Sequence, residues 1–206
     1  REKIQQYLKQ HQELFGERIY LPEDVFKENL NNNNTNSSTL NEYYVKIKDC
    51  LKCSLGYSRT NFVYGVGNPN ADLVFVGEAP GHNEDMKGEP FVGRAGKLLD
   101  KILAAVSLSR QDVFICNVLK CRPPENRNPS SKEIEKCRPY LDTQLNMIHP
   151  KAIIALGKVA ANTLLENDLA LNKMRGVPFL YNGIDVIVTY HLAALLRNPN
   201  FKKPCW

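Results

Sequence analysis

The sequence has no long run of apolar residues and no bias toward glycine or proline. None of its apolar stretches approaches the roughly 18 residues that a membrane-spanning helix needs, and its 206 residues include only 12 glycines and 12 prolines. These absences exclude a membrane span, a collagen-like chain and full disorder. Hydrophobic residues make up 43% of the chain, which is enough to build the core of one ordinary domain.

An apolar secretory signal is also missing from the start of the sequence. Residues 1–12 are polar and charged, whereas a secretory signal has an apolar central stretch. We therefore expect a cytoplasmic protein. Among its six cysteines, Cys50 and Cys53 form a C-x-x-C pair. In a reducing compartment this usage indicates metal or cluster ligation rather than disulfides.

The basic excess is small and unevenly distributed. The formal net charge is +5, and residues 50–206 carry 20 basic against 14 acidic residues. A basic folded part is compatible with a polyanionic partner such as nucleic acid. An excess of this size is equally common in proteins that never bind nucleic acid.

Four short apolar runs have the character of strands buried on both faces. They cover residues 73–76, 113–116, 152–156 and 185–189. Helical patterns lie between them, over residues 95–106, 131–147 and 158–166. This alternation predicts an α/β fold around a central, mostly parallel four-stranded sheet.

The N-terminal part of the sequence has a different organisation. Short helices are expected over residues 1–13 and 22–30, and the Asn-rich tract 29–39 has the composition of a flexible linker. A further helix over residues 40–49 leads into the C-x-x-C pair. We therefore divide the chain into an N-terminal extension, residues 1–40, and a folded domain, residues 41–206.

The loop after the first strand carries the richest chemistry. In α/β sheets, ligands bind beyond the carboxyl ends of the strands. Here the loop begins Gly77-Glu78-Ala79-Pro80-Gly81 and continues through Glu84 to Phe91. One interpretation is a solvated acidic loop. The other is a tight pocket for a small planar polar molecule, with Phe91 stacked on its face.

The second and fourth strands also end in polar residues. Asn117 follows the second strand; its amide can match the edge of a base, although capping a turn is the more common role of a single asparagine. His191 follows the fourth strand. Leu195 and Leu196 beside Arg197 are either core residues of a short helix or an apolar wedge next to a phosphate-binding charge.

Four cysteines from three segments can close one site. Cys50, Cys53, Cys121 and Cys137 suit a tetrahedral zinc ion or an iron–sulfur cluster, and spacing alone does not choose between them. Cys116, inside a predicted strand, is expected to be a small buried hydrophobe.

Four segments together resemble the family 4, iron–sulfur, uracil-DNA glycosylases. The segments are Gly77-Glu78-Ala79-Pro80-Gly81-x-x-Glu84-Asp85, Pro90-Phe91-Val92-Gly93-Arg94-Ala95-Gly96, Lys120-Cys121-Arg122-Pro123-Pro124-x-Asn126-Arg127 and His191-x-x-x-Leu195-Leu196-Arg197-Asn198-Pro199. The resemblance covers about residues 50–199. It implies a three-layer α/β/α sandwich and a monomeric repair enzyme that removes uracil from single- or double-stranded DNA.

The resemblance also implies roles for residues of the base pocket. Gly77, Glu78, Ala79 and Gly81 fall in the loop that lines the pocket and positions the attacking water. The residues expected to contact uracil are Glu84 at its C5 edge, Phe91 on its face, Asn117 at its O4/N3 edge and His191 at O2.

Further implied roles concern DNA and the cofactor. Leu195 matches the side chain that enters the duplex, and Arg94 and Arg197, with Arg59 or Arg127, would hold phosphates. Cys50, Cys53, Cys121 and Cys137 match the ligands of a structural [4Fe–4S] cluster. The chain departs from the family in having Leu192 where a proline usually follows the histidine.

Two other functions remain open at this point. One is a non-catalytic module, stapled by zinc or a cluster, that binds DNA or a replication partner. The other is a related glycosylase for a different deaminated base.

Overall fold

The computed structural model of the chain describes residues 35–201. The helices expected over residues 1–13 and 22–30 lie outside this range. The first described helix, α2 (Thr35–Ile47), begins five residues earlier than expected and takes up the end of the Asn-rich tract. The domain boundary at residue 40 stays a prediction.

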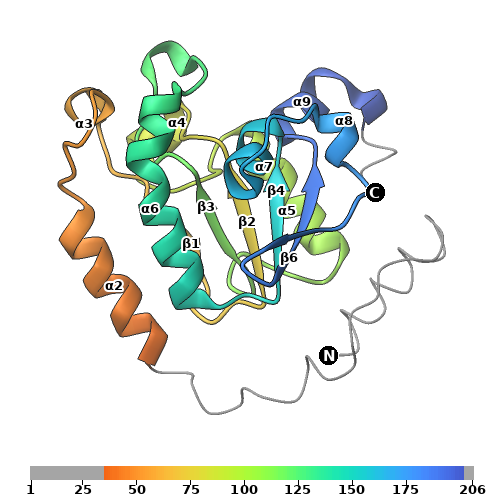
Figure 1. Cartoon of the computed structure of the whole chain (residues 1–206), viewed down its shortest axis with the longest axis horizontal. Coiled ribbons are helices and arrows are strands. Elements are labelled where there is room, and N and C mark those ends of the chain that lie inside the picture. The colour runs from red at the N-terminus through yellow and green to blue at the C-terminus, as the bar shows by residue number, and fades with distance from the viewer. Residues whose placement is uncertain (1–34, 202–206) are drawn as a thin grey trace.

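The four predicted strands form the centre of one sheet. They are β2 (Leu73–Gly77), β3 (Phe114–Asn117), β4 (Ala152–Leu156) and β6 (Ile184–Thr189). Each pairs in parallel with its neighbour, in the order β3-β2-β4-β6. The expectation of a parallel central sheet is therefore confirmed. The carboxyl ends of these four strands all lie at one edge of the molecule (Figure 1).

The predicted number of strands is wrong, because the sheet formed within residues 35–201 has six. Two short strands lie antiparallel at its edges: β1 (Val66–Gly67) beside β3, and β5 (Phe179–Tyr181) beside β6. Two and three residues are too few to show an alternating pattern. The β5–β6 hairpin did have a signal in the sequence, the pair Asn182-Gly183. Both residues take positive φ, as a tight two-residue hairpin turn requires.

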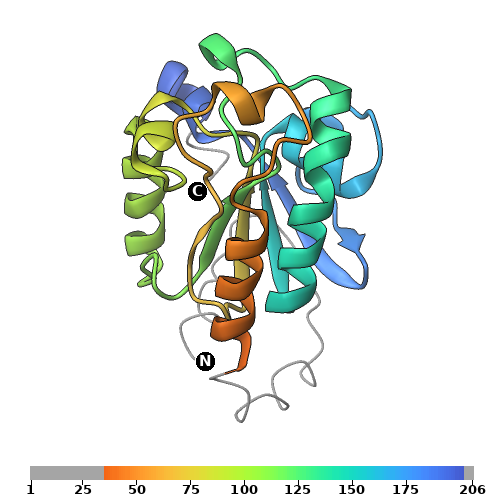
Figure 2. The ribbon, with the colours of Figure 1, turned by 90° about the vertical axis from the view of Figure 1, so that its left-hand side faces the viewer.

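Helices cover both faces of the sheet, which confirms the three-layer sandwich (Figure 2). On one face lie α2, α6 (Ser131–Ile148) and α7 (Lys158–Leu165). The other face carries α5 (Arg94–Ala105) and α9 (Leu192–Arg197). The long helices match their predicted bounds to within one residue. The remaining short helices are α3 (Leu55–Ser58), α4 (His82–Lys87), α8 (Leu171–Met174), η2 (Pro124–Asn126) and η3 (Pro199–Phe201).

The core is split in two by the sheet. Successive strand residues point to opposite faces, so Val74 and Val76 pack toward α6 whereas Phe75 packs toward α5. No helix among residues 35–201 is both long and apolar enough to cross a membrane. With both faces covered, the carboxyl end of the sheet is where loops from several strands meet.

Candidate active site

The ends of β2 and β3 place two of the predicted residues side by side. Gly77 and Asn117 are the last residues of their strands and are direct partners in the sheet. A Cβ atom built on Gly77 would lie 2.3 Å from Asn117 Oδ1 and 2.6 Å from Phe91 Cζ. Only glycine leaves room there for the amide and the ring together.

The end of β6 brings His191 to the same place. The centroids of the Phe91 and His191 rings are 6.2 Å apart, with an angle of 33° between the ring planes. Gly157, directly after β4, has a φ of +97°, and a Cβ atom there would lie 3.0 Å from His191 Cβ. The structure therefore brings Phe91, Asn117 and His191 together from three separate segments.

Asn117 has a buried side chain with an unmet hydrogen-bonding group. The residue is 2% exposed, and its Oδ1 has no hydrogen-bond partner among residues 35–201. A buried polar atom without a partner is costly and rare. This amide therefore has the character of a group that receives a donor from a ligand.

His191 is held in one protonation state by its surroundings. Its Nδ1 accepts a hydrogen bond from the Ala193 backbone N–H at 3.2 Å and caps α9. Burial, together with the positive charge of Arg197, lowers the pKa of the imidazole, while Glu84 opposes the shift. The neutral ring with an accepting Nδ1 carries its proton on Nε2, which remains available to donate.

The loop after β2 holds the other predicted pocket residues. Glu78 is half-buried, and this burial raises the pKa of its carboxyl group. Its backbone carbonyl accepts the Leu119 N–H at 3.0 Å. Ala79 is half-buried beside the core, and Gly81 caps the start of α4. These residues thus follow Gly77 in the loop between β2 and α4.

Glu84 makes contacts that its predicted role did not include. Its Oε1 accepts hydrogen bonds from the backbone N–H groups of Val92 and Gly93, at 2.9 and 2.8 Å. Its Oε2 is 2.8 Å from where a Cβ atom on Gly81 would lie. The carboxylate thus ties together the two halves of the loop that follows β2.

Leu195 is a correction to the sequence-based interpretation. Its side chain is 2% exposed and packs in the cluster that holds Phe91 and Leu192. In this conformation it is a core residue of a short helix, the alternative that the sequence left open, because a side chain that packs inward cannot also project as a wedge. Its neighbour Leu196 is half-buried.

The predicted phosphate contacts divide into two groups. Arg94 and Arg197 are exposed. Arg59 instead donates to the carbonyl oxygens of Cys50 and Lys48, at 2.6 and 2.7 Å. Arg127 forms an ion pair with Glu133 at 2.6 Å. The structure therefore leaves Arg94 and Arg197 as the better candidates.

Comparison with known proteins identifies the family to which this arrangement belongs. The sequence model of the Uracil DNA glycosylase superfamily matches residues 64–206. The type-4 uracil-DNA glycosylase of Archaeoglobus fulgidus is 46% identical over 173 residues, which cover 80% of this chain and 87% of that protein. The chain belongs to the type-4 uracil-DNA glycosylases. The type-4 uracil-DNA glycosylase of Sulfurisphaera tokodaii is 48% identical, over 77% of this chain and 78% of that protein. That of Thermotoga maritima is 45% identical, over 74% of this chain and 81% of that protein.

In this type-4 family member the four predicted thiols lie together beside the core. Cys121 interacts electrostatically with Cys50 and Cys53, and Cys137 interacts with Cys121 and Cys53. Three of them accept hydrogen bonds: Cys50 from Tyr140 Oη at 3.1 Å, Cys121 from Arg59 at 3.3 Å and Cys137 from the Lys120 backbone N–H at 3.3 Å. An all-sulfur donor set surrounded by such donors suits a thiolate-ligated group.

The pKa and the spacing of these thiols indicate which kind of metal group would fit between them. Burial raises the pKa of the Cys137 thiol to about 12, so only a strong nearby positive charge would keep it as a thiolate at neutral pH. Within residues 35–201, no three His, Cys, Asp or Glu side chains stand close enough to hold a single metal ion. The thiols of a cluster stand further apart, because several iron and sulfur atoms lie between them.

Lys120 is a residue that the sequence analysis did not single out. It is fully buried, and its Nζ donates to the Asn117 carbonyl at 2.8 Å and to Gln144 Oε1 at 2.5 Å. Burial lowers its pKa, while the neighbouring thiols oppose the shift. Through its Nζ and its backbone N–H, Lys120 thereby links the backbone of Asn117 to Cys137. The available signal was its place directly after the apolar Val118 and Leu119.

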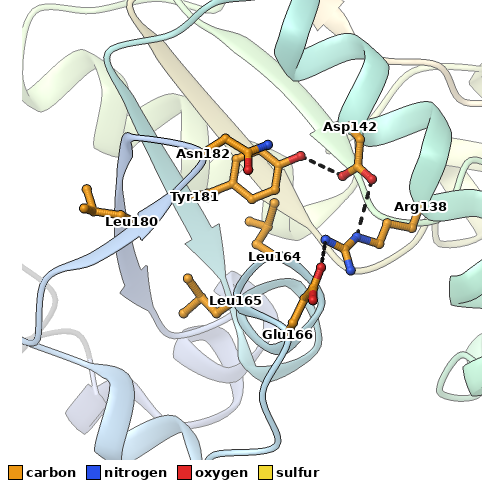
Figure 3. A pocket seen from close by; sticks show the side chains of 8 residues that line it. All are labelled: Arg138, Asp142, Leu164, Leu165, Glu166, Leu180, Tyr181 and Asn182. Carbon is orange, nitrogen blue, oxygen red and sulfur yellow. Dashed lines mark hydrogen bonds and ion pairs between the residues drawn. The ribbon is translucent and has the colours of Figure 1, made fainter.

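A separate hollow of about 470 Å³ lies away from this site. It is beside the turn that joins β5 and β6, at the other end of the sheet (Figure 3). There Arg138 pairs with Glu166 at 2.6 Å and with Asp142 at 3.5 Å, and Tyr181 donates to Asp142 at 2.7 Å. These groups are paired with one another, and none of the residues predicted for the site lines the hollow.

Proposed function

We propose that the chain is a uracil-DNA glycosylase that hydrolyses the N-glycosidic bond of deoxyuridine in DNA, releases uracil and leaves an abasic site. The observation that carries the proposal is the meeting of Phe91, Asn117 and His191 at the strand ends. An aromatic face, a buried amide and an imidazole together suit a single extruded pyrimidine. The name shared by the relatives supports the same activity.

Asn117 would read the Watson–Crick edge of the base. Uracil presents a donor at N3 and an acceptor at O4, which match the oxygen and the NH₂ group of an amide. The N3–H of uracil would supply the partner that Asn117 Oδ1 lacks. Cytosine presents the reverse pattern at these positions, so the same amide would reject it.

His191 would stabilise the leaving group. As the glycosidic bond breaks, the sugar approaches an oxocarbenium ion and negative charge develops on uracil, including O2. The Nε2–H of a neutral imidazole, already oriented by the bond from Ala193, can donate to that oxygen. Loss of one such preorganised donor typically slows a reaction ~10²–10³-fold.

Glu78 and the neighbouring backbone would position the attacking water. Glu78 is half-buried directly after Gly77, and Ala79 and Gly81 follow in the same loop. We assign Glu78 to this step mainly for the electrostatic field of its carboxyl group and for its backbone polar groups, which would orient the water. If Glu78→Gln retained full single-turnover activity, the carboxylate would have no part in this step.

Glu84 would exclude thymine at the C5 edge, and its bonds to Val92 and Gly93 support a fixed position for the carboxylate. Arg94 and Arg197 would bind phosphates on either side of the flipped nucleotide. Helix α9 would supply the wedge. The burial of Leu195 favours a supporting role under Phe91 and favours Leu196 as the side chain that enters the duplex.

Cys50, Cys53, Cys121 and Cys137 would hold a [4Fe–4S] cluster. Such a group would supply structural cross-linking rather than chemistry at the glycosidic bond. The protein's own contribution is the set of donors from Tyr140, Arg59 and the Lys120 backbone to three of the sulfurs.

Action as a monomer is part of the proposal and rests on the family resemblance. The cytoplasmic location rests on the sequence alone and remains part of the proposal.

A labelled single-stranded oligonucleotide with one uracil tests the activity. After incubation with the protein, alkali should cleave the strand at the uracil, and matched strands carrying thymine or cytosine should stay intact. His191→Ala should slow cleavage ~10²–10³-fold. No scission at all would favour the non-catalytic module, and scission only at another base, such as hypoxanthine, would favour the related glycosylase.

A further inference from the structure

Phe91 has a backbone conformation that an aromatic residue does not adopt unaided. Its φ is +53°, in the left-handed region where a side chain crowds the backbone. The residue is nonetheless buried, with its ring against Gly77 and beside His191. Something in the surrounding structure must therefore hold the backbone in this conformation.

Arg110 supplies two hydrogen bonds to this part of the backbone. It lies in the turn between α5 and β3, 19 positions along the chain from Phe91. Its Nη1 donates to the Pro90 carbonyl at 3.1 Å, and its Nη2 donates to the Phe91 carbonyl. Its Nε forms an ion pair with Asp100 of α5 at 2.6 Å, so the guanidinium is itself held in place.

Two other contacts close the loop from its remaining sides. Glu84 accepts the N–H groups of Val92 and Gly93, the residues directly after Phe91. The Phe91 carbonyl also packs directly on α5, because a Cβ atom on Gly96 would lie 1.5 Å from its oxygen. The carbonyl can keep this position only while a donor satisfies it.

We propose that Arg110 is a positioning residue for base recognition: it locks the Phe91 backbone so that the ring lies in the slot beside Asn117 and His191. This inference rests on the proposed function. Without Arg110, Phe91 relaxes to an ordinary φ and its ring moves away from Gly77. Lysine cannot replace Arg110, because a single ammonium lacks the planar fork that spans two carbonyls and a carboxylate.

A double-mutant cycle on uracil release tests the proposal, with Arg110→Gln and Phe91→Ala made singly and together. In the wild-type background, Arg110→Gln should lower kcat/KM about tenfold or more, mostly through KM, because stacking acts on the bound base before and during reaction. In the Phe91→Ala background, Arg110→Gln should change kcat/KM less than about twofold, because the ring on which it acts is gone. Arg110→Lys should behave like Arg110→Gln.

Arg138→Gln is the matched control. Arg138 is an ion-paired arginine with the same side-chain exposure, 26%, whose partners Asp142 and Glu166 lie outside the base pocket, and its loss should leave kcat/KM unchanged. If Arg110→Gln does not fold, Asp100→Asn removes the carboxylate that orients the guanidinium and should give a smaller KM effect, again absent in the Phe91→Ala background.

Equal losses in both backgrounds, or no loss in either, would overturn the role of Arg110 while uracil release by the wild type stands. A wild type that releases no uracil would overturn the proposed function instead, and with it this inference.

Discussion

At His191, two separate contacts act on one imidazole ring. The Ala193 backbone N–H requires an unprotonated Nδ1, and burial with the charge of Arg197 lowers the pKa of the ring. Protonation would place a hydrogen on Nδ1 and break the cap of α9. The start of α9 and the proposed catalytic donor therefore depend on the same protonation state.

The pH dependence of His191 follows from this arrangement. A lowered pKa keeps the ring neutral to a lower pH than an ordinary histidine, so uracil release should persist there and fall only below the shifted pKa. Arg197→Gln removes a charge that lowers the pKa, so the pKa should rise and the acid limb of the activity profile should move to higher pH. NMR titration of the His191 ring measures the shift directly.

Arg138→Gln provides the control for this titration, because Arg138 pairs with Asp142 and Glu166 and is not among the charges that shift the His191 pKa. An unchanged or lower pKa in Arg197→Gln would contradict the electrostatic account.

At this scale, sequence reasoning finds the residues that end strands and misses those that support them. Asn117 and His191 follow apolar runs, which gave them a predictable place. Arg110 stands in an ordinary polar turn, and only the folded chain brings it to Phe91, 19 positions away. Leu195 is a case in which the sequence motif suggested the wrong environment. The motif suggested an exposed wedge, whereas packing with Phe91 and Leu192 buries the side chain.

Among the helices of residues 35–201, α6 has the most complete N-terminal cap. Ser130 Oγ accepts the Glu133 N–H at 3.3 Å, and Glu133 Oε2 accepts the Ser130 N–H at 2.8 Å. Arg127 pairs with the same carboxylate and, with these bonds, lowers the pKa of Glu133 to about 2. The helix that carries Cys137 therefore begins at a fixed residue.

Glu133→Gln should lower the free energy of unfolding by about 1–2 kcal/mol at neutral pH, because the capping box and the ion pair are both weakened. The stabilisation by Glu133 is present above the unfolded-state pKa, about 4.3, and is lost as pH falls toward about 2. Denaturant unfolding at pH 7 and pH 3 should therefore show a smaller difference from wild type at the lower pH.

Glu135→Gln serves as the comparison on the same helix. Its side chain is exposed, so its effect should stay within about 0.5 kcal/mol. A difference between Glu133→Gln and wild type that grows at low pH would contradict this account of the cap.

Helix α9 carries two adjacent leucines with different expected roles: Leu195 packs in the core, and Leu196 is proposed to contact DNA. Leu195→Ala should lower the free energy of unfolding by about 2–5 kcal/mol, because a fully buried side chain is removed. Leu196→Ala should leave stability nearly unchanged and slow uracil release from double-stranded DNA about tenfold more than from single-stranded DNA, where no base has to leave a duplex. A duplex-specific loss in a folded Leu195→Ala variant, with none in Leu196→Ala, would return the wedge to Leu195.

For the molecule as a whole, the four cysteines bring together three segments that are distant in the chain. Cys50 and Cys53 come from the segment after α2, Cys121 from the loop after β3 and Cys137 from α6. Ligation of a common group would fix these three segments together, in addition to their apolar contacts.

Cys53→Ser should remove most of the bound iron and the visible absorption of the protein, and should lower its thermal stability, because one ligand of the proposed cluster is lost. Iron and acid-labile sulfide per chain, with thermal unfolding, are the measurements. Cys116→Ala, which changes a buried thiol in β3 outside the proposed ligand set, should retain its iron. Zinc without sulfide in the wild type would replace the cluster with a zinc site.

The layers and the parallel centre of the fold could be predicted because long apolar strands and amphipathic helices leave a pattern in the sequence. The edge strands β1 and β5 could not, because two or three residues paired by the rest of the sheet show no pattern of their own. The convergence of Phe91 with Asn117 and His191 could be expected because loops after parallel strands meet at one edge of the sheet and because their motifs resemble one family. The left-handed backbone of Phe91 could not, since it depends on Glu84, Gly96 and Arg110 acting together.

The stretch from Asn117 to Cys121 is only five residues long, yet it spans the distance between the base pocket and the thiols. The Lys120 side chain turns back to the Asn117 carbonyl, while its backbone N–H reaches Cys137. Inserting or deleting one residue here would pull either the amide or the sulfur out of place. The two sites that this stretch joins therefore fix its length as well as the side chains at its ends.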